Sequence, residues 1–139
     1  MTFIVNVITV CFNEHDSIER CLRSVHEQDW PDVQHIVIDG GSNDGTAEII
    51  GQHQDQLHYF VSEADEGIYA AMNKALAHCD GEIVYFLNAD DYFYSPQVIS
   101  KAMARFSAEP ELDILCGRVQ FFNTPIVDGE PYARNDFSF

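Results

Sequence analysis

Basic residues are scarce in this sequence. Seven Lys and Arg stand against 23 Asp and Glu in 139 residues, which gives a formal net charge of −16 with His neutral. A field of this sign repels the phosphate backbone of nucleic acid, and no cluster of Lys or Arg is present to attract the chain to anionic lipid. We therefore expect neither nucleic acid nor an unaided membrane surface as a partner. An anionic substrate would have to bind through a metal ion or through local backbone N–H groups.

Long apolar runs and paired cysteines are also missing. No run approaches the ~20 apolar residues of a membrane span, and the N-terminal MTFIVNVITV lacks the basic region and the cleavage site of a signal peptide. Cys11, Cys21, Cys79 and Cys116 form no C-x-x-C pair and no zinc-finger spacing, so we expect reduced thiols. These absences predict a cytoplasmic protein. With 46% hydrophobic residues and no low-complexity run, the chain fits one globular domain.

The apolar residues that are present change their period along the chain. Phe3 to Val10 is β-branched and apolar at most positions, which is typical of a strand buried on both faces. From Asp16, apolar residues recur at helical spacing until Trp30-Pro31-Asp32. This alternation repeats and predicts an α/β domain with a mostly parallel sheet. Strands are expected at 3–10, 35–39, 57–62, 82–88 and 112–122, with the run 83–87 buried, and further helices at 46–51, 68–79 and 99–106.

Polar side chains gather where ligands of such sheets bind, which is at the carboxyl ends of the strands. The segments 9–14, 39–46 and 88–91 each follow a predicted strand and should lie along one edge of the sheet. The second of them, DGGSNDGT, has glycines that let the backbone approach a ligand and free N–H groups at a helix start. It also fits an ordinary turn capped by Ser42, Asn43 or Asp44, and it matches neither an EF-hand nor a Walker loop.

Asp90 and Asp91 form an acidic pair directly after a predicted strand. Mg²⁺ or Mn²⁺ takes one or two carboxylates and completes its shell with water and phosphate oxygens, so the pair is a candidate metal site. Such an ion would remove the repulsion between the two charges. The alternative is that Asp91 caps the next segment and that Asp90 is solvated. Lys74, one of two lysines, is either a solvated charge or a group near a phosphate site.

Four motifs occur in order: ITVCFNE, VIDGGSNDGT, SEADEGIYAAMNKAL and FLNADD. Together they resemble the family 2 glycosyltransferases over nearly all of residues 1–122. The resemblance implies the GT-A fold, which is a Rossmann-like, mostly parallel sheet with helices on both faces. It implies that 1–122 form the core that binds a nucleotide sugar, and that the irregular tail 123–139 begins a missing or truncated acceptor half. The GIYAAMNKA segment is most similar to bacterial transferases that build cell-surface polysaccharides.

The resemblance also assigns a donor site residue by residue. It implies that Asp39 contacts the nucleobase and that Lys74 is the basic residue near the nucleotide or diphosphate. Asn88 stands where the family's D-x-D motif has its first Asp. Asp90 and Asp91 would be the ligands of Mn²⁺ or Mg²⁺. The implied nucleotide-sugar-binding set is Thr9, Phe12, Asn13, Glu14, Asp39, Asp44, Lys74, Asn88 and Asp90.

The implied reaction transfers a sugar from a nucleotide diphosphate donor to an acceptor hydroxyl. The acceptor would be a glycan or a lipid-linked molecule, and a partner protein could then hold the chain at a membrane. The metal would stabilise the leaving nucleoside diphosphate, and a carboxylate would act as general base in an inverting reaction. That base normally lies downstream of D-x-D. Asp128, Glu130 and Asp136 are the only carboxylates of the tail and none sits in an acceptor motif, so no catalytic residue is assigned.

Two other functions fit parts of the sequence. A non-catalytic module that holds a nucleotide sugar without turning it over would have the same donor site. A phosphoacceptor receiver domain is also a parallel α/β domain with an acidic metal cluster, but it needs an acidic pair after the first strand and a Lys after the last. Here Phe12-Asn13-Glu14 follows the first predicted strand, and residues 117–123 contain no Lys. A metal-dependent glycosyltransferase is therefore the predicted function.

Overall fold

The computed structural model of the protein describes residues 2–119, which belong to two compact units, Met1–Ala108 and Glu109–Phe139. In the second unit, residues 109–119 form neither helix nor strand. No helix among the described residues is long and apolar enough to cross a membrane. The elements of the first unit are β1 (Val5–Cys11), α1 (Ile18–His26), β2 (Val33–Asp39), α2 (Thr46–Gln52), η1 (Gln54–Gln56), β3 (Tyr59–Ser62), α3 (Ile68–Leu76), β4 (Ile83–Phe86) and α4 (Val98–Ala108).

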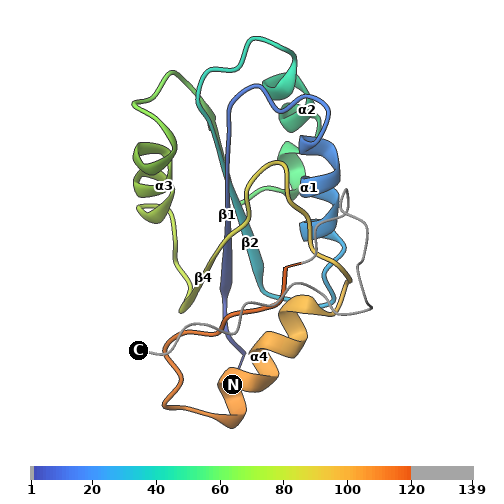
Figure 1. The fold of residues 1–139 in the computed structure, drawn as a ribbon, viewed down its shortest axis with the longest axis vertical. Coiled ribbons are helices and arrows are strands. Elements are labelled where there is room, and N and C mark those ends of the chain that lie inside the picture. The colour runs from blue at the N-terminus through green and yellow to red at the C-terminus, as the bar shows by residue number, and fades with distance from the viewer. Residues whose placement is uncertain (1, 120–139) are drawn as a thin grey trace, which may run out of the picture. The chain divides into compact units, whose positions relative to one another are not determined.

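The four strands form one parallel sheet in the order β3-β2-β1-β4 (Figure 1). β1 has a neighbour on each side, with Val7 opposite His35 of β2 and opposite Tyr85 of β4. Consecutive parallel strands need a crossover between them, and α1, α2 and α3 supply the three crossovers. The predicted α/β domain with a mostly parallel sheet is confirmed.

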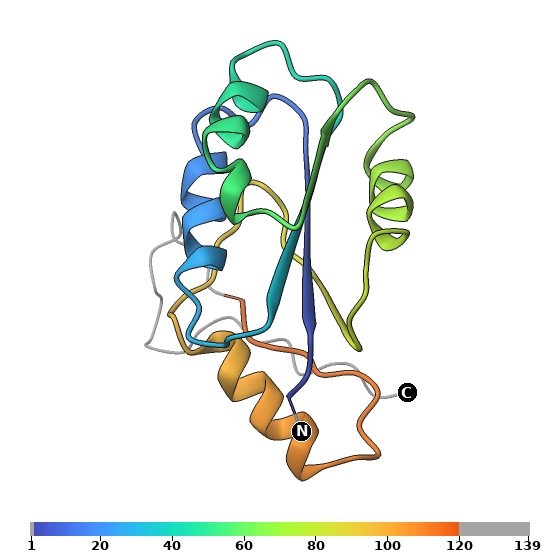
Figure 2. The ribbon, with the colours of Figure 1, turned by 180° about the vertical axis from the view of Figure 1, so that it is seen from behind.

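Helices cover both faces of the sheet, with α1 and α2 on one face and α3 on the other (Figures 1 and 2). The side chains of β1 alternate between these faces, since successive residues of a strand point in opposite directions. Ile8 and Val10 pack with Ala71 of α3, whereas Cys11 packs with Leu22 of α1. All seven residues of β1 are buried, as expected for a strand that is covered on both faces.

Two predictions about strands are wrong. The run 83–87 is not a buried strand within residues 2–119, where β4 pairs only with β1 and its Val84, Tyr85 and Phe86 are 39%, 45% and 43% exposed. The strand expected at 112–122 is absent over 112–119, and its last three residues lie outside the described residues. Strand propensity reflects packing against neighbouring strands, so an apolar run without such a neighbour need not extend the sheet.

Candidate functional site

A cleft of about 610 Å³ opens at the carboxyl ends of the strands, on the side of the sheet that α3 covers. Val10 and Ala71 form part of its apolar wall. The side chains predicted for the donor site that line it are Phe12, Glu14, Asn88 and Asp90. The Phe12 ring is 59% exposed, so an apolar ligand face has a surface on which to stack.

The loops after β1 and β2 form one hydrogen-bonded wall of this site. The backbone N–H of Asn13 donates to Ser42 Oγ at 2.8 Å, and the N–H of Asn43 donates back to Asn13 Oδ1 at 3.0 Å. The N–H of Glu14 donates to Thr46 Oγ1 at 2.9 Å. Asn13 has a φ of 54°, a left-handed conformation that Asn tolerates better than most residues. Phe12 and Glu14 are therefore presented by a loop whose backbone is already fixed.

Asp39 holds this wall together from inside the protein. Its fully buried carboxylate accepts hydrogen bonds from the N–H groups of Gly41 and Ser42, from the Ser42 hydroxyl, and from Ser62 Oγ at 2.6 Å. Burial alone would raise the pKa of this carboxyl, but the hydrogen bonds from Ser42 and Ser62 outweigh burial and hold its pKa below the usual value. The charged Asp39 side chain thus holds the loop after β2 through hydrogen bonds, and it does not line the cleft.

Asp44 joins the same two loops at the start of α2. Its carboxylate accepts from the N–H groups of Thr46, at 3.0 Å, and His15, at 3.2 Å. The N-cap of α2 is Gly45, whose φ of 98° suits glycine, and not Ser42, Asn43 or Asp44 as an ordinary capped turn would have it. Asp44 lies one residue before the N-cap. Hydrogen bonding from Thr46 is the main cause that lowers the pKa of the exposed Asp44 carboxyl.

Two residues of the predicted donor set lie away from the cleft. The side chain of Thr9 is fully buried under α1, with its hydroxyl 2.8 Å from His35 Nε2, so it cannot line a pocket. The alternation of β1 explains this, since Val10 points toward α3 and its neighbour must point the other way. Lys74 donates from Nζ to Glu63 Oε1 at 2.6 Å, and neither residue lines the cleft.

The acidic pair lies on the loop after β4, at the opposite wall of the cleft from Asp39. Both carboxylates are exposed, and Asp90 lines the cleft whereas Asp91 does not. The N–H of Asp91 donates to the carbonyl of Asn88 at 3.0 Å, which closes the loop into a turn. Burial and the neighbouring charge of Asp90 raise the pKa of the Asp91 carboxyl above its usual value. This wall therefore carries two adjacent, exposed carboxylates.

The acidic pair fits a metal ion only in part. No group of three or more His, Cys, Asp and Glu side chains within residues 2–119 is arranged to hold a metal. A divalent ion that keeps water and phosphate oxygens needs only one or two carboxylates from the protein, however. Burial and, after it, the charge of Asp90 raise the pKa of Asp91, and a bound cation would favour the ionised form of this carboxyl. Asp90 and Asp91, with the amide oxygen of Asn88, are the oxygen donors available at this wall.

A protein-family model, described as glycosyl transferase family 2, matches residues 6–135. The chain belongs to glycosyl transferase family 2. The membership and the GT-A fold expected from the four motifs are both confirmed.

Curated relatives of this family 2 chain are glycosyltransferases. An uncharacterized glycosyltransferase of Mycobacterium tuberculosis is 37% identical over 114 residues, which cover 81% of this chain and 44% of the relative. The putative teichuronic acid biosynthesis glycosyltransferase TuaG of Bacillus subtilis is 37% identical over 91 residues, covering 63% of this chain and 36% of TuaG. The chain thus spans less than half the length of these relatives.

Solved structures give the same family 2 picture. The mannosyltransferase PcManGT of Pyrobaculum calidifontis, in complex with GDP-Man and Mn²⁺, superposes with a TM-score of 0.71 at 30% identity, covering 77% of this chain and 33% of that protein. The S. aureus protein TarS, residues 1–349 in complex with UDP-GlcNAc, has a TM-score of 0.68 at 26% identity, covering 78% of this chain and 32% of that one.

Sequence reasoning missed one carboxylate of the family 2 cleft. Asp65 follows β3 and lines the cleft, and its carboxylate also accepts a hydrogen bond from the N–H of Gly67 at 2.9 Å. It lies so close to Gly40 that an added Cβ at that glycine would come within 3.1 Å of Asp65 Oδ2. The rule that ligands bind at the carboxyl ends of strands, applied to β3 as well, would have found Asp65.

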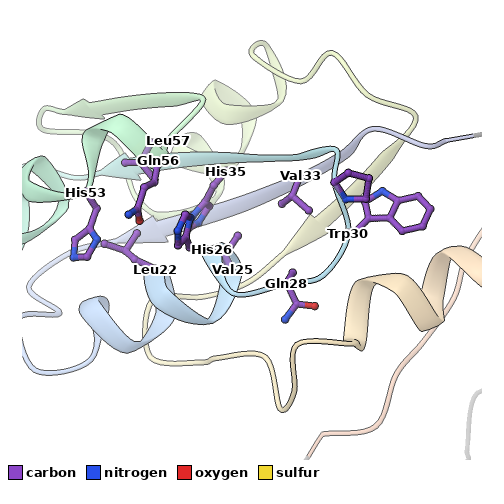
Figure 3. Close-up of a pocket in the computed structure, with 11 residues that line it drawn as sticks. Leu22, Val25, His26, Gln28, Trp30, Val33, His35, His53, Gln56 and Leu57 are labelled. Atoms are coloured by element: carbon purple, nitrogen blue, oxygen red, sulfur yellow. The ribbon is translucent and has the colours of Figure 1, made fainter.

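A second pocket lies apart from the cleft, between α1, β2 and the segment around η1 (Figure 3). It has a volume of about 170 Å³, and none of the predicted site residues lines it. Its wall includes His26, His35 and His53, and the ring of His35 is buried. Burial lowers the pKa of His35 to about 3, so this imidazole is neutral in the folded protein at pH 7.

Proposed function

We propose that this chain is the donor-binding part of a glycosyltransferase that moves a sugar from a nucleotide diphosphate sugar to an acceptor hydroxyl. One observation carries the proposal: in a family 2 chain, the cleft at the carboxyl ends of the strands is lined by Phe12, Glu14, Asn88 and Asp90, from two of the four recognised motifs. The likeness to structures solved with GDP-Man and with UDP-GlcNAc supports a nucleotide sugar as ligand.

The two walls of the cleft would bind different parts of the donor. Phe12 and Glu14, on the wall fixed by Asn13, Asp39 and Asp44, would receive the nucleoside. Because Asp39 is buried, its proposed effect on the nucleobase passes through the loop that it holds. Lys74 would reach the diphosphate only after leaving Glu63, and an exposed ion pair of this kind is worth about 1 kcal/mol or less. Thr9 is left out of the site.

At the other wall, Asp90 and Asp91 would hold Mn²⁺ or Mg²⁺, with Asn88 beside them. When bound, such an ion supplies positive charge that stabilises the leaving nucleoside diphosphate. The side chains of this wall would position the diphosphate end of the donor and keep two negative charges at the place where the cation is needed. An inverting reaction, a role in bacterial polysaccharide synthesis, a glycan or lipid-linked acceptor and a cytoplasmic location belong to this proposal, and no residue is assigned as the base.

Ligand-induced stabilisation tests the donor site. The chain is heated with UDP-, GDP- and dTDP-sugars in the presence and absence of Mn²⁺, and one donor is expected to raise the melting temperature only with Mn²⁺. A ligand at about a hundred times its dissociation constant adds roughly 2.7 kcal/mol to the free energy of unfolding. The variant Asp90→Ala plus Asp91→Ala should lose this gain. A gain of the same size in the double variant would contradict the metal site.

The same sample separates an enzyme from a module that only holds the donor. Release of nucleoside diphosphate, followed with and without added acceptor, reports turnover. Donor binding without any release would support the non-catalytic module for this chain. A receiver domain finds no support in a family 2 sequence.

A further inference from the structure

A shallow groove lies between α1 and the loop from Tyr92 to Pro96. It has a volume of about 240 Å³ and shares no lining residue with the donor cleft. Tyr92, the first residue of this loop, lies two residues after Asp90, which lines the cleft at the carboxyl ends of the strands. The side chains that give it chemical character are Arg20, Arg23, Tyr92 and Tyr94.

Hydrogen bonds fix the groove before any ligand arrives. The N–H of Phe93 donates to Ser24 Oγ at 3.1 Å, and Gln28 Nε2 donates to the Ser95 carbonyl at 2.8 Å. The N–H of Asp29 donates to the Pro96 carbonyl at 2.9 Å. Three bonds tie this loop to α1 and to the two residues Gln28 and Asp29 after it, so little loop entropy is left to be lost on binding.

The charges of the groove differ from those of the chain around it. Arg20 and Arg23 are two of only seven Lys and Arg in a chain of net charge −16. The guanidinium of Arg20 lies 4.3 Å from the centre of the Tyr92 ring. Arg23 pairs with Glu19 at 3.0 Å, but both side chains are mostly exposed, so an incoming anion can replace this partner at a cost of less than about 1 kcal/mol.

Tyr94, Glu27 and the volume of the groove indicate which kind of ligand it can bind. The Tyr94 ring is 81% exposed beside the two arginines and offers an apolar face with a hydroxyl at its end, which suits the face of a sugar ring. Glu27 also lines the groove and opposes a ligand of high negative charge. The volume is below the roughly 300–1,000 Å³ of pockets that enclose a drug-sized molecule, so it suits one residue of a longer chain.

We propose that this groove binds an acidic saccharide. The guanidinium groups of Arg20 and Arg23 bind the carboxylate or phosphate of one sugar residue, since arginine matches both groups with paired hydrogen bonds. Tyr94 packs against the ring of that residue. Placing this saccharide as the acceptor, beside Asp90 and Asp91, rests on the proposed function, whereas the binding itself does not.

The test compares two ligands that differ by one carboxylate. Methyl β-D-glucuronide and methyl β-D-glucoside are titrated into the full ¹⁵N-labelled chain without metal ion, and amide shifts are followed. The glucuronide is expected to shift the amides of residues 20–28 and 92–95 at lower concentration than the glucoside. The variant Arg20→Gln plus Arg23→Gln should weaken glucuronide binding about tenfold or more, the effect of losing charge-assisted hydrogen bonds. Tyr94→Ala should weaken both ligands.

Lys101→Gln plus Arg105→Gln, on α4, is the matched control, because it removes two positive charges outside the groove. It should leave glucuronide binding within about twofold. Equal binding of the two glycosides, equal loss in the control variant, or glucuronide shifts outside the groove would each overturn the proposal. Donor binding with Mn²⁺ is measured separately on every variant. Glucuronide binding without donor binding would refute the proposed function and leave the groove assignment standing.

Discussion

β2 and β4 lie on either side of β1, and the loop that follows each of them lines the cleft. The two strands nevertheless differ in burial and in how the loops after them are held. β2 is buried from His35 to Asp39, and its loop is held by the Asp39 carboxylate. In the sheet of the described residues, β4 is an edge strand with three half-exposed apolar residues, and the loop after it carries the exposed pair Asp90 and Asp91. The Asp39 carboxylate has its hydrogen-bond donors inside the protein, whereas the Asp90 and Asp91 side chains are exposed to solvent.

This contrast indicates different tasks for chemically identical groups. The Asp39 carboxylate has four hydroxyl and N–H donors around it, so its charge is used to hold a shape. The raised pKa of Asp91 means that burial, together with the charge of Asp90, opposes ionisation of the Asp91 carboxyl. A ligand or cation can recover that free energy, whereas nothing remains to be recovered at Asp39. Mutations should therefore separate stability from binding.

The largest effect is expected for Asp39→Ala. Removing this buried carboxylate leaves the hydroxyls of Ser42 and Ser62 and two N–H groups without their acceptor, so the free energy of unfolding should fall by about 3 kcal/mol or more. Asp90→Ala, at an exposed position, should change it by less than about 0.5 kcal/mol. Urea denaturation of both variants measures this, with Asp39→Asn as the isosteric control of intermediate effect. Similar losses at positions 39 and 90 would remove the distinction between the two walls.

The same substitution of one valine on β2 and one on β4 compares how much burial of each strand contributes to stability. Val37 on β2 is fully buried and Val84 on β4 is 39% exposed. Val37→Ala should destabilise the protein by about 2 kcal/mol, from lost burial plus a residual cavity, and Val84→Ala by less than about 1 kcal/mol. The substitution is identical, so intrinsic strand propensity cancels in the difference between the two midpoints in urea. Equal midpoints would mean that β4 is covered in solution.

Acid sensitivity is also expected to reside in β2, through His35. The unfolded chain protonates this imidazole as the pH falls below about 6.5, whereas the folded protein resists until about pH 3, so stability is lost as the pH decreases through this window. Between pH 7 and pH 5 the loss should be about 2 kcal/mol. His35→Gln, which can still bond to Thr9, should flatten the difference. An unchanged pH slope in this variant would show that other groups cause it.

Most of the fold follows from residue patterns. The alternation of β-branched runs with helical stripes predicted the parallel sheet. The apolar residues at helical spacing after Asp16 form the buried face of α1, which consists of Ile18, Cys21, Leu22 and Val25. Burial of 83–87 could not be predicted, because an apolar run does not reveal whether its strand has one neighbour or two. The strand predicted at 112–122 failed over its described part for the same reason.

The site was predictable to the level of segments but less well for side chains. The rule of carboxyl strand ends brought the loops with Phe12 and Asp90 together at one cleft. The side chains of Thr9 and Asp39 do not line the cleft, and their predicted roles at the donor stay predictions. Strand alternation decides the face toward which each residue points, and the sequence did not reveal which face the cleft uses. Lys74 was expected near a phosphate, and its partner Glu63 became visible only when the loop before α3 was placed in space.

Asp91→Asn is expected to have the smallest effect. It distinguishes best between the acidic pair as a metal site and Asp91 as a cap of the following segment. Because the folded pKa of Asp91 is raised, the charged carboxylate destabilises the native state above that pKa, and its neutralisation should increase stability at pH 7 by up to about 0.5 kcal/mol. Asp113→Asn, at an exposed position, corrects for the general relief of net charge. A loss of stability in Asp91→Asn would instead identify Asp91 as a cap for the following segment. With donor and Mn²⁺ present the order should reverse, since wild type alone then gains the cation.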